Sequence, residues 1–204
     1  MAQHLILVFS VPLILLGAPM IPMLRGLPRI TRRALVRPVL TARAVRILLR
    51  LLTRPIVAWC LYVIIMIGWH FPTPYDLAAK SEPIHIVEHA TMMIGSLLFW
   101  WNIVTPVPMK ANLSRLAKIP YIFLAVVPNF ILGAFITHSP SPWYETYEGT
   151  TLAYNISQLE DQQIGGVLMW IPGSFIMLTA FIIVLVQFAR AEEESQRAAE
   201  RRQA

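Results

Sequence analysis

The stretch SEPIHIVEHATMMIGSLLFWWNIV, residues 81–104, combines two features that together decide how this chain folds. Its second half is a run of apolar and aromatic residues that can enter a membrane as a helix. Its first half holds metal-ligating side chains at helical spacing: His85, Glu88, His89, Met92 and Met93. The stretch therefore predicts a membrane helix that begins with a concentration of ligand-type side chains.

The composition of the whole chain is that of a membrane protein. Of its 204 residues, 56% are hydrophobic and 14% are charged, whereas soluble domains carry about 25% charged residues. These values predict an all-α membrane protein, with one transmembrane domain over residues 1–190 and a charged tail at 191–204. The domain is expected to contain about five spans, since five apolar stretches approach the length of about 20 residues that crosses a bilayer. They lie at residues 4–24, 55–71, 84–104, 119–138 and 162–189.

The distribution of basic residues predicts the orientation of these spans. Nine arginines lie in the loop at 25–54, and the segments 105–118 and 190–204 hold all but one of the other basic residues. The exception is Lys80. By the positive-inside rule, the N-terminus is expected outside and the C-terminus in the cytoplasm. The first span has no basic residue before it, which is unlike a cleaved signal peptide.

The end of the arginine-rich loop, TARAVRILLRLLTRP at residues 41–55, has the pattern of an amphipathic helix on the membrane surface. Its arginines recur at helical spacing around a leucine face, at Arg43, Arg46, Arg50 and Arg54. We expect this face to bind anionic lipids of the inner leaflet, with a partner protein as the alternative. The net charge of +6 therefore does not indicate nucleic acid, because the basic residues lie between apolar spans.

The polar side chains at the outer ends of the predicted spans lie at one membrane depth. All five histidines of the chain fall there, and ionisable groups at membrane depth are usually functional. We therefore expect a metal site at the outer face, with ligands drawn from His4, His70, His85, His89, Met92 and Met93. Around them we expect hydrogen-bonding partners or additional ligands from Glu88, His138, Asp161 and Gln162.

The residue types in this set favour two classes of metal ion. Imidazole with thioether suits Cu(I), whereas imidazole with carboxylate suits Zn(II), Cu(II) or iron. Asp161 has three candidate roles: a hydrogen bond to a ligating imidazole, direct ligation, or capping of a helix. A purely structural alternative is that the histidines bond at headgroup level and that Trp69, Trp100 and similar residues form an interfacial aromatic belt. The single cysteine, Cys60, excludes an intrachain disulfide.

Four longer motifs occur in order along the chain: QHLILVFSVPLILLGAP at 3–19, GWHFPTPYD at 68–76, HIVEHATMMIGSLLFWW at 85–101 and DQQIGGVLMWIPG at 161–173. Together they resemble the CtaG family of cytochrome c oxidase assembly proteins, the polytopic group linked to caa-type oxidases. The resemblance implies a multi-pass protein of the bacterial plasma membrane that is needed for oxidase maturation and handles copper. It carries over as motif positions, without assigned roles, His4, His70, His85, His89 and Asp161.

The chain departs from the family pattern at two points. Further spans usually precede the Gln-His pair, whereas three residues precede His4 here, and an apolar or aromatic residue usually stands at the place of His138. We expect a non-enzymatic assembly factor that binds or delivers copper to a cytochrome oxidase subunit or another membrane metalloprotein complex. The alternatives are a haem-binding protein, with a pair such as His70 and His89 on the iron, or a structural subunit of a membrane redox complex.

Overall fold

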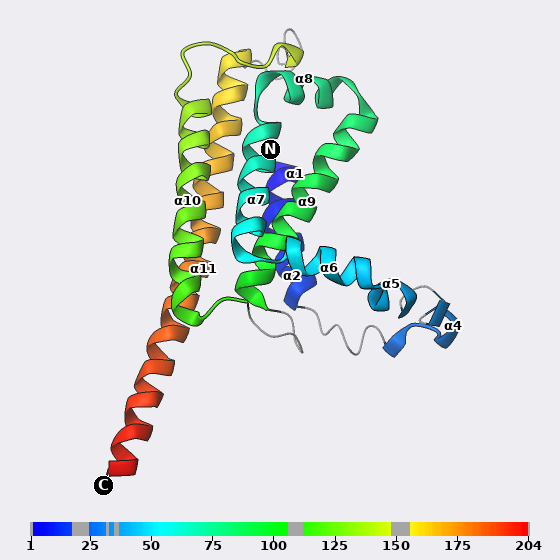
Figure 1. Cartoon of the computed structure of the whole chain (residues 1–204). Helices are drawn as coiled ribbons and strands as arrows, with labels where there is room; N and C mark the ends of the chain where they lie inside the picture. The colour runs from blue at the N-terminus through cyan, green and yellow to red at the C-terminus, as the bar shows by residue number, and fades with distance from the viewer. Residues whose placement is uncertain are drawn as a thin grey trace. The chain divides into compact units, whose positions relative to one another are not determined.

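The computed structural model of the chain describes residues 2–17, 25–31, 33–34, 37–105, 112–147 and 156–203 (Figure 1). Every regular element in these ranges is a helix, which confirms the predicted all-α class. The helices are α1 (Ala2–Leu5), η1 (Ile6–Ser10), α2 (Val11–Gly17), α4 (Arg29–Thr31), α5 (Arg37–Thr41), α6 (Arg43–Leu52), α7 (Pro55–Trp69), α8 (Pro72–Lys80), α9 (Glu82–Val104), α10 (Arg115–Thr137), η3 (Glu145–Tyr147) and α11 (Gln158–Gln203). The chain divides into two compact units, residues 3–112 and residues 113–204 with the first two residues.

Helix α9 organises the unit formed by residues 3–112. It packs against α7, α8, η1 and α2. Its buried residues recur every three or four positions, as one face of a helix does: Glu88, Met92, Gly95, Ser96, Phe99, Trp100, Asn102 and Ile103. The interpretation of Trp100 as an interfacial belt residue was wrong, since its side chain is fully buried as part of this face. The same face begins, at its N-terminal end, with the carboxylate of Glu88.

A backbone carbonyl of the N-terminal segment is bonded to this face of α9. The segment consists of α1, the π-helix η1 and α2. Position 12 is a proline, which has no N–H to donate to the carbonyl of Val8 four residues earlier. That carbonyl instead accepts hydrogen bonds from the hydroxyl of Ser96 and, at 3.0 Å, from the indole of Trp100. The Val8 carbonyl thus joins the N-terminal segment to α9.

Prolines also set both ends of α7. Pro55 stands in its first turn, where a missing N–H costs nothing, and the preceding Arg54 is extended, with ψ 134°. Across this point α6 is bent by 72° from α7 (Figure 1). Helix α7 ends at Trp69, and α8 follows from Pro72. The 15 residues of α7 therefore place α6 about 22 Å along the helix from His70.

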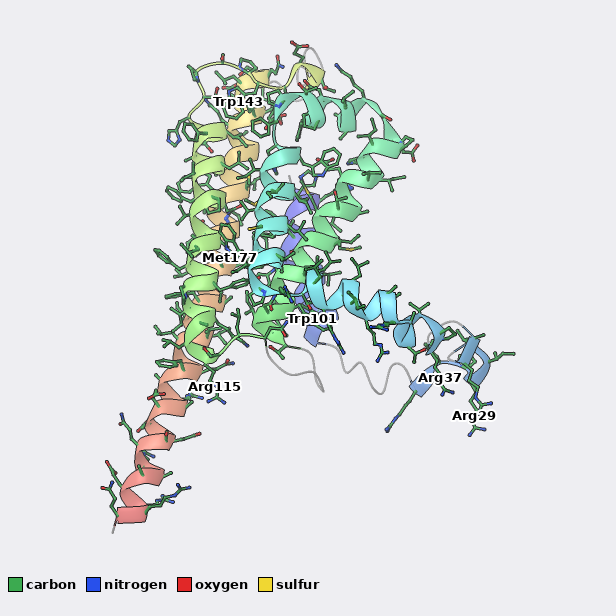
Figure 2. All side chains as sticks on the ribbon, in the orientation of Figure 1. Arg29, Arg37, Trp101, Arg115, Trp143 and Met177 are labelled. Atoms are coloured by element: carbon green, nitrogen blue, oxygen red, sulfur yellow. The ribbon has the colours of Figure 1, made fainter. Side chains whose placement is uncertain are left out.

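In the unit formed by residues 113–204, α10 and α11 lie side by side. Close approach of the two backbones depends on small residues at their contact. A Cβ atom at Gly166 would lie 2.5 Å from Thr137 Oγ1 and 2.8 Å from Thr137 N, and one at Gly133 would overlap the Cβ of Trp170. Met177, labelled in Figure 2, is fully buried farther along α11.

Two helices among the described residues, α10 and α11, are long and apolar enough to cross a membrane, and the bent pair α6–α7 is a third if it forms one span. Predicted span 84–104 forms a helix of 23 residues, but polar residues in its first turns lower its hydropathy, and α9 does not meet the same test. Predicted span 4–24 is described only to residue 17. Helix α11 continues through the charged tail, where Arg197 and Glu193 form an ion pair at 2.5 Å.

The glycine contact between α10 and α11 can be tested with one methyl group. Gly166→Ala should lower the unfolding free energy by about 1–3 kcal/mol, because the backbone of Thr137 cannot yield as a side chain would. Gly68→Ala is the matched control, since a Cβ there has nothing within 4 Å and alanine favours the helix by about 1 kcal/mol. Thermal unfolding in detergent, followed by circular dichroism, measures both. Equal melting temperatures for the two variants would contradict this packing.

Candidate metal centre

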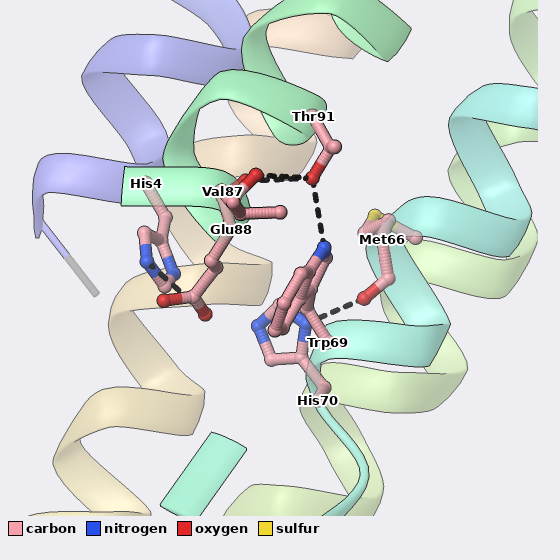
Figure 3. Close-up of polar contacts among 7 residues, drawn as sticks. All are labelled: His4, Met66, Trp69, His70, Val87, Glu88 and Thr91. Atoms are coloured by element: carbon pink, nitrogen blue, oxygen red, sulfur yellow. Dashed lines mark hydrogen bonds and ion pairs between the residues drawn. The ribbon is translucent and has the colours of Figure 1, made fainter. Parts of the chain in front are cut away.

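A carboxylate and an imidazole meet in the interior of the 3–112 unit (Figure 3). Glu88 of α9 is 3% exposed, and its Oε1 lies 3.7 Å from Nε2 of His4 on α1. The helical register of α9 places Glu88 on the face that packs against protein, in line with Met92 and Ser96. A buried carboxylate is costly unless a cation or a set of donors compensates it. The pairing with His4 therefore defines the polar centre of the unit.

Three further imidazoles surround this pair. The ring centroid of His4 lies 5.0 Å from that of His89 and 6.1 Å from that of His70, each ring being tilted by 79°. The rings of His89 and His85 lie 4.2 Å apart. Four of the five histidines thus come from α1, the end of α7 and the first turns of α9 to one place. These four side chains share one predicted membrane depth, and in the structure they lie together.

The group formed by His4, Glu88 and His89, here called the His-Glu-His cluster, has the donor set of a metal site. One ligand atom from each residue lies within 4.8 Å of the other two. A metal ion with bonds of about 2.0–2.1 Å spans at most about 4.2 Å between opposite ligands, so a small closure of the side chains would suffice. Within the described parts of the chain, His4 Nδ1, Glu88 Oε1 and His89 Nε2 are buried without a hydrogen-bond partner. These residues therefore fit a bound cation.

A hydrogen bond orients the ring of His70 at the edge of the cluster. Its Nδ1 lies 2.6 Å from the carbonyl oxygen of Met66 (Figure 3). A carbonyl only accepts, so Nδ1 carries the proton and Nε2 keeps its lone pair. Bonds of this kind commonly fix the ring of a metal-ligating histidine. His70 thus has the tautomer that ligation through Nε2 requires.

A tryptophan–threonine bond joins the two helices that carry these histidines. The indole of Trp69 donates to Thr91 Oγ1 at 2.9 Å, and that hydroxyl shares its one proton between the carbonyls of Val87 and Glu88, at 2.8 and 3.0 Å (Figure 3). Trp69 precedes His70, so the bond fixes the end of α7 against the first turns of α9. Trp69 was expected in an aromatic belt, and its bond to Thr91 is a different role. No spacing rule connects residues 69 and 91.

The remaining candidates of α9 lie beside the cluster. His85 is half-buried one turn before His89. Met92 is 3% exposed and lies one turn past Glu88, about 6 Å along the helix axis, and Met93 is half-buried beside it. Glu88, expected around the metal, belongs to the three residues with the closest ligand atoms. Its place on the buried face of α9 is the sequence signal that could have ranked it higher.

Three other candidates, His138, Asp161 and Gln162, belong to the 113–204 unit. His138 ends α10, where its Nδ1 lies 2.9 Å from the carbonyl of Ala134. Gln162 is buried; its Oε1 accepts from the backbone N–H of Trp143 at 2.6 Å and its Nε2 donates to the carbonyl of Ile136 at 3.4 Å. The amide of Gln162 therefore holds the loop that follows α10.

The cap of α11 is formed by residues other than Asp161. The hydroxyl of Ser157 accepts from the backbone N–H of Glu160 at 3.2 Å, and Oε2 of Glu160 accepts from the N–H of Ser157 at 2.7 Å. This reciprocal pair is a capping box. Asp161 stands half-buried in the first turn of the helix. Of its three expected roles, the capping role is filled by Ser157 and Glu160.

Comparison with known proteins places the chain in one family. Residues 1–191 match the family described as cytochrome c oxidase caa3 assembly factor (Caa3_CtaG). Uncharacterized proteins of Mycobacterium leprae and Mycobacterium tuberculosis are 24% and 26% identical to the chain, over 204 and 197 residues. Each alignment covers 94% of this chain and 30% of the relative, so the chain spans about a third of their length. No solved structure matches it. The chain belongs to the family of cytochrome c oxidase caa3 assembly factors.

Proposed function

We propose that this chain is an assembly factor that binds copper in the His-Glu-His cluster and passes it to a cytochrome oxidase subunit during assembly. The observation that carries the proposal is the convergence of three ligand atoms within 4.8 Å in the interior of one compact unit. Membership of an oxidase assembly family supports copper as the ion, because a haem-copper oxidase requires it. The protein needs no covalent chemistry for this role.

The donor set indicates the oxidation state of the copper that is bound. Two imidazoles with a carboxylate suit Cu(II), whereas a thioether would favour Cu(I). The carboxylate of Glu88 supplies a negative charge that offsets a buried cation, and His70 offers a further nitrogen beside it. His4 is 12% exposed, so the cluster lies close enough to the surface for an ion to be exchanged with a partner.

The proposed site faces the outside of the bacterial plasma membrane, in a multi-pass protein with about five spans and a cytoplasmic C-terminus. The arginines that follow Gly17 and precede Pro55 support this orientation through the positive-inside rule. Helix α7 carries His70 at one end and adjoins α6 at the other. The copper site then lies opposite the basic helix, on the side where the partner oxidase subunit would receive the ion.

Copper retention tests the cluster with two glutamates of one helix. Glu88→Gln keeps the size of the side chain and removes its charge; it should lower copper affinity more than the 10–100-fold typical of residues that only support a ligand. Glu82→Gln, in the exposed first turn of α9, is the matched control. Metal analysis of purified protein measures copper per chain, and oxidase activity in host membranes should fall with it.

The same comparison can be made with histidines. His4→Ala should lose copper, whereas His138→Ala, at the end of α10, should retain it. Undiminished copper in both Glu88→Gln and His4→Ala would refute the cluster as the site. An intense Soret absorption of the purified protein would instead assign the histidines to haem.

Orientation can be measured with two exposed alanines of the 3–112 unit, in a Cys60→Ala background. Ala79 lies in α8, next to the histidine end of α7, and Ala44 lies in α6, at the other end. A membrane-impermeant maleimide added to intact cells should label Ala79→Cys and not Ala44→Cys, since the arginines retain α6 in the cytoplasm. Labelling of Ala44→Cys and not Ala79→Cys would show that the topology is the opposite of the proposed one.

A further inference from the structure

Helix α6 presents a narrow stripe of arginines beside a broad apolar face. At 100° per residue, Arg43, Arg46 and Arg50 fall within a sector of about 60°, and the aliphatic residues occupy the opposite side, with Leu48 at its middle. Contacts within the described chain do not cover either side, since no residue of α6 is buried. Four of its aliphatic side chains are 44–54% exposed: Ile47, Leu48, Leu49 and Leu51.

The arginines of α6 also lack acidic partners in the segment around them. The chain contains no Asp or Glu before Asp76, and the two ion pairs found among the described residues, at His4 and Arg197, do not involve α6. Further arginines of the same loop, Arg29 and Arg37, extend outward from the ribbon (Figure 2). The surface is therefore uniformly cationic beside exposed hydrocarbon.

Such a helix is unstable in water and suits the boundary of a bilayer. A peptide of ten residues forms an α-helix only marginally by itself, and its exposed leucines would be solvated at a cost. In the headgroup region the leucines can enter the acyl layer while the arginines extend to the phosphates. The bend of 72° between α6 and α7 supplies the required geometry. With α7 as the predicted span at residues 55–71, a helix nearly perpendicular to it lies nearly in the membrane plane.

We propose that α6 is an interfacial helix that binds anionic phospholipid, with Leu48 directed into the acyl layer and Arg43, Arg46 and Arg50 at the phosphates. The attachment fixes the depth of Pro55, and with it the height of His70 about 22 Å along α7. The basic helix thus sets the depth in the membrane of the histidine end of α7. This proposal does not depend on the metal bound there.

The test measures the depth of Leu48 in the full chain. A nitroxide on Leu48→Cys, in a Cys60→Ala background, is reconstituted in vesicles of phosphatidylcholine with or without phosphatidylglycerol. Electron paramagnetic resonance then compares its collisions with dissolved oxygen and with a water-soluble nickel chelate. In vesicles with phosphatidylglycerol, the probe should collide more often with oxygen than with the nickel chelate, as a probe in the acyl layer does. Each basic side chain near an anionic surface strengthens attachment about fivefold, so replacing Arg43, Arg46 and Arg50 with glutamine should weaken it roughly 100-fold and expose the probe to nickel.

A charge-matched control separates this effect from net charge. Replacing Arg197, Arg201 and Arg202 of the tail with glutamine should leave the probe at its wild-type depth. Salt at 1 M shortens the Debye length to about 3 Å and so screens the attraction between the arginines and the lipid. With the three arginines in place, it should make the probe collide more often with the nickel chelate. Accessibility to nickel in both kinds of vesicle would overturn the proposal and favour an acidic protein partner. Burial that is independent of lipid charge and of the three arginines would also overturn it, leaving apolar insertion alone.

Discussion

The burial of the Glu88 carboxylate is the constraint on which the 3–112 unit depends. At 3% exposure, Glu88 heads the face of α9 that packs against protein. A carboxylate in that place requires hydrogen-bond donors or a cation, and the fold brings ligand atoms of His4 and His89 to it, with His70 and His85 beside these two rings. His4 arrives because the Val8 carbonyl, which has no N–H four residues later to bind, is held by Ser96 and Trp100 farther along the same face. His70 arrives because Trp69 is bonded to Thr91.

The packing that buries the apolar face of α9 also brings the residues of the His-Glu-His cluster together. The stripe that contains Met92, Phe99 and Trp100 buries α9 against η1, α2 and α7. Any register that buries this stripe also buries Glu88, since residues at i and i+4 share a helix face. A protein that only needed stability would place an apolar residue there, because replacing a buried ionic group with a hydrophobic one is often neutral or stabilising. Retention of a carboxylate beside histidines is therefore an argument for a ligand.

The sequence was sufficient for the long helices and for the proximity of four of the histidines, but it did not predict α8. Apolar length predicted α7, α9, α10 and α11 to within a few residues, except that α11 continues through the tail to Gln203. Equal depth of the histidines predicted that His4, His70, His85 and His89 would meet. The predicted membrane depth of a residue does not say which way its side chain points. It therefore could not show that Glu88 is a stronger ligand candidate than its neighbours or that Trp100 is buried, because both depend on which face of α9 packs against protein. The bonds from Trp69 to Thr91 and from Ser96 to Val8 are long-range contacts without a local pattern.

X-ray absorption spectroscopy of the copper-loaded, full-length protein tests most directly whether His4, Glu88 and His89 hold the ion. This ligand set predicts a shell of nitrogen and oxygen atoms only, with the multiple-scattering pattern of two or three imidazoles and no sulfur. Met92 and Met93 would then remain side chains of the packed helix. A shell dominated by sulfur, or copper without imidazole scattering, would contradict the account and assign the ion to the methionines or to the protein surface.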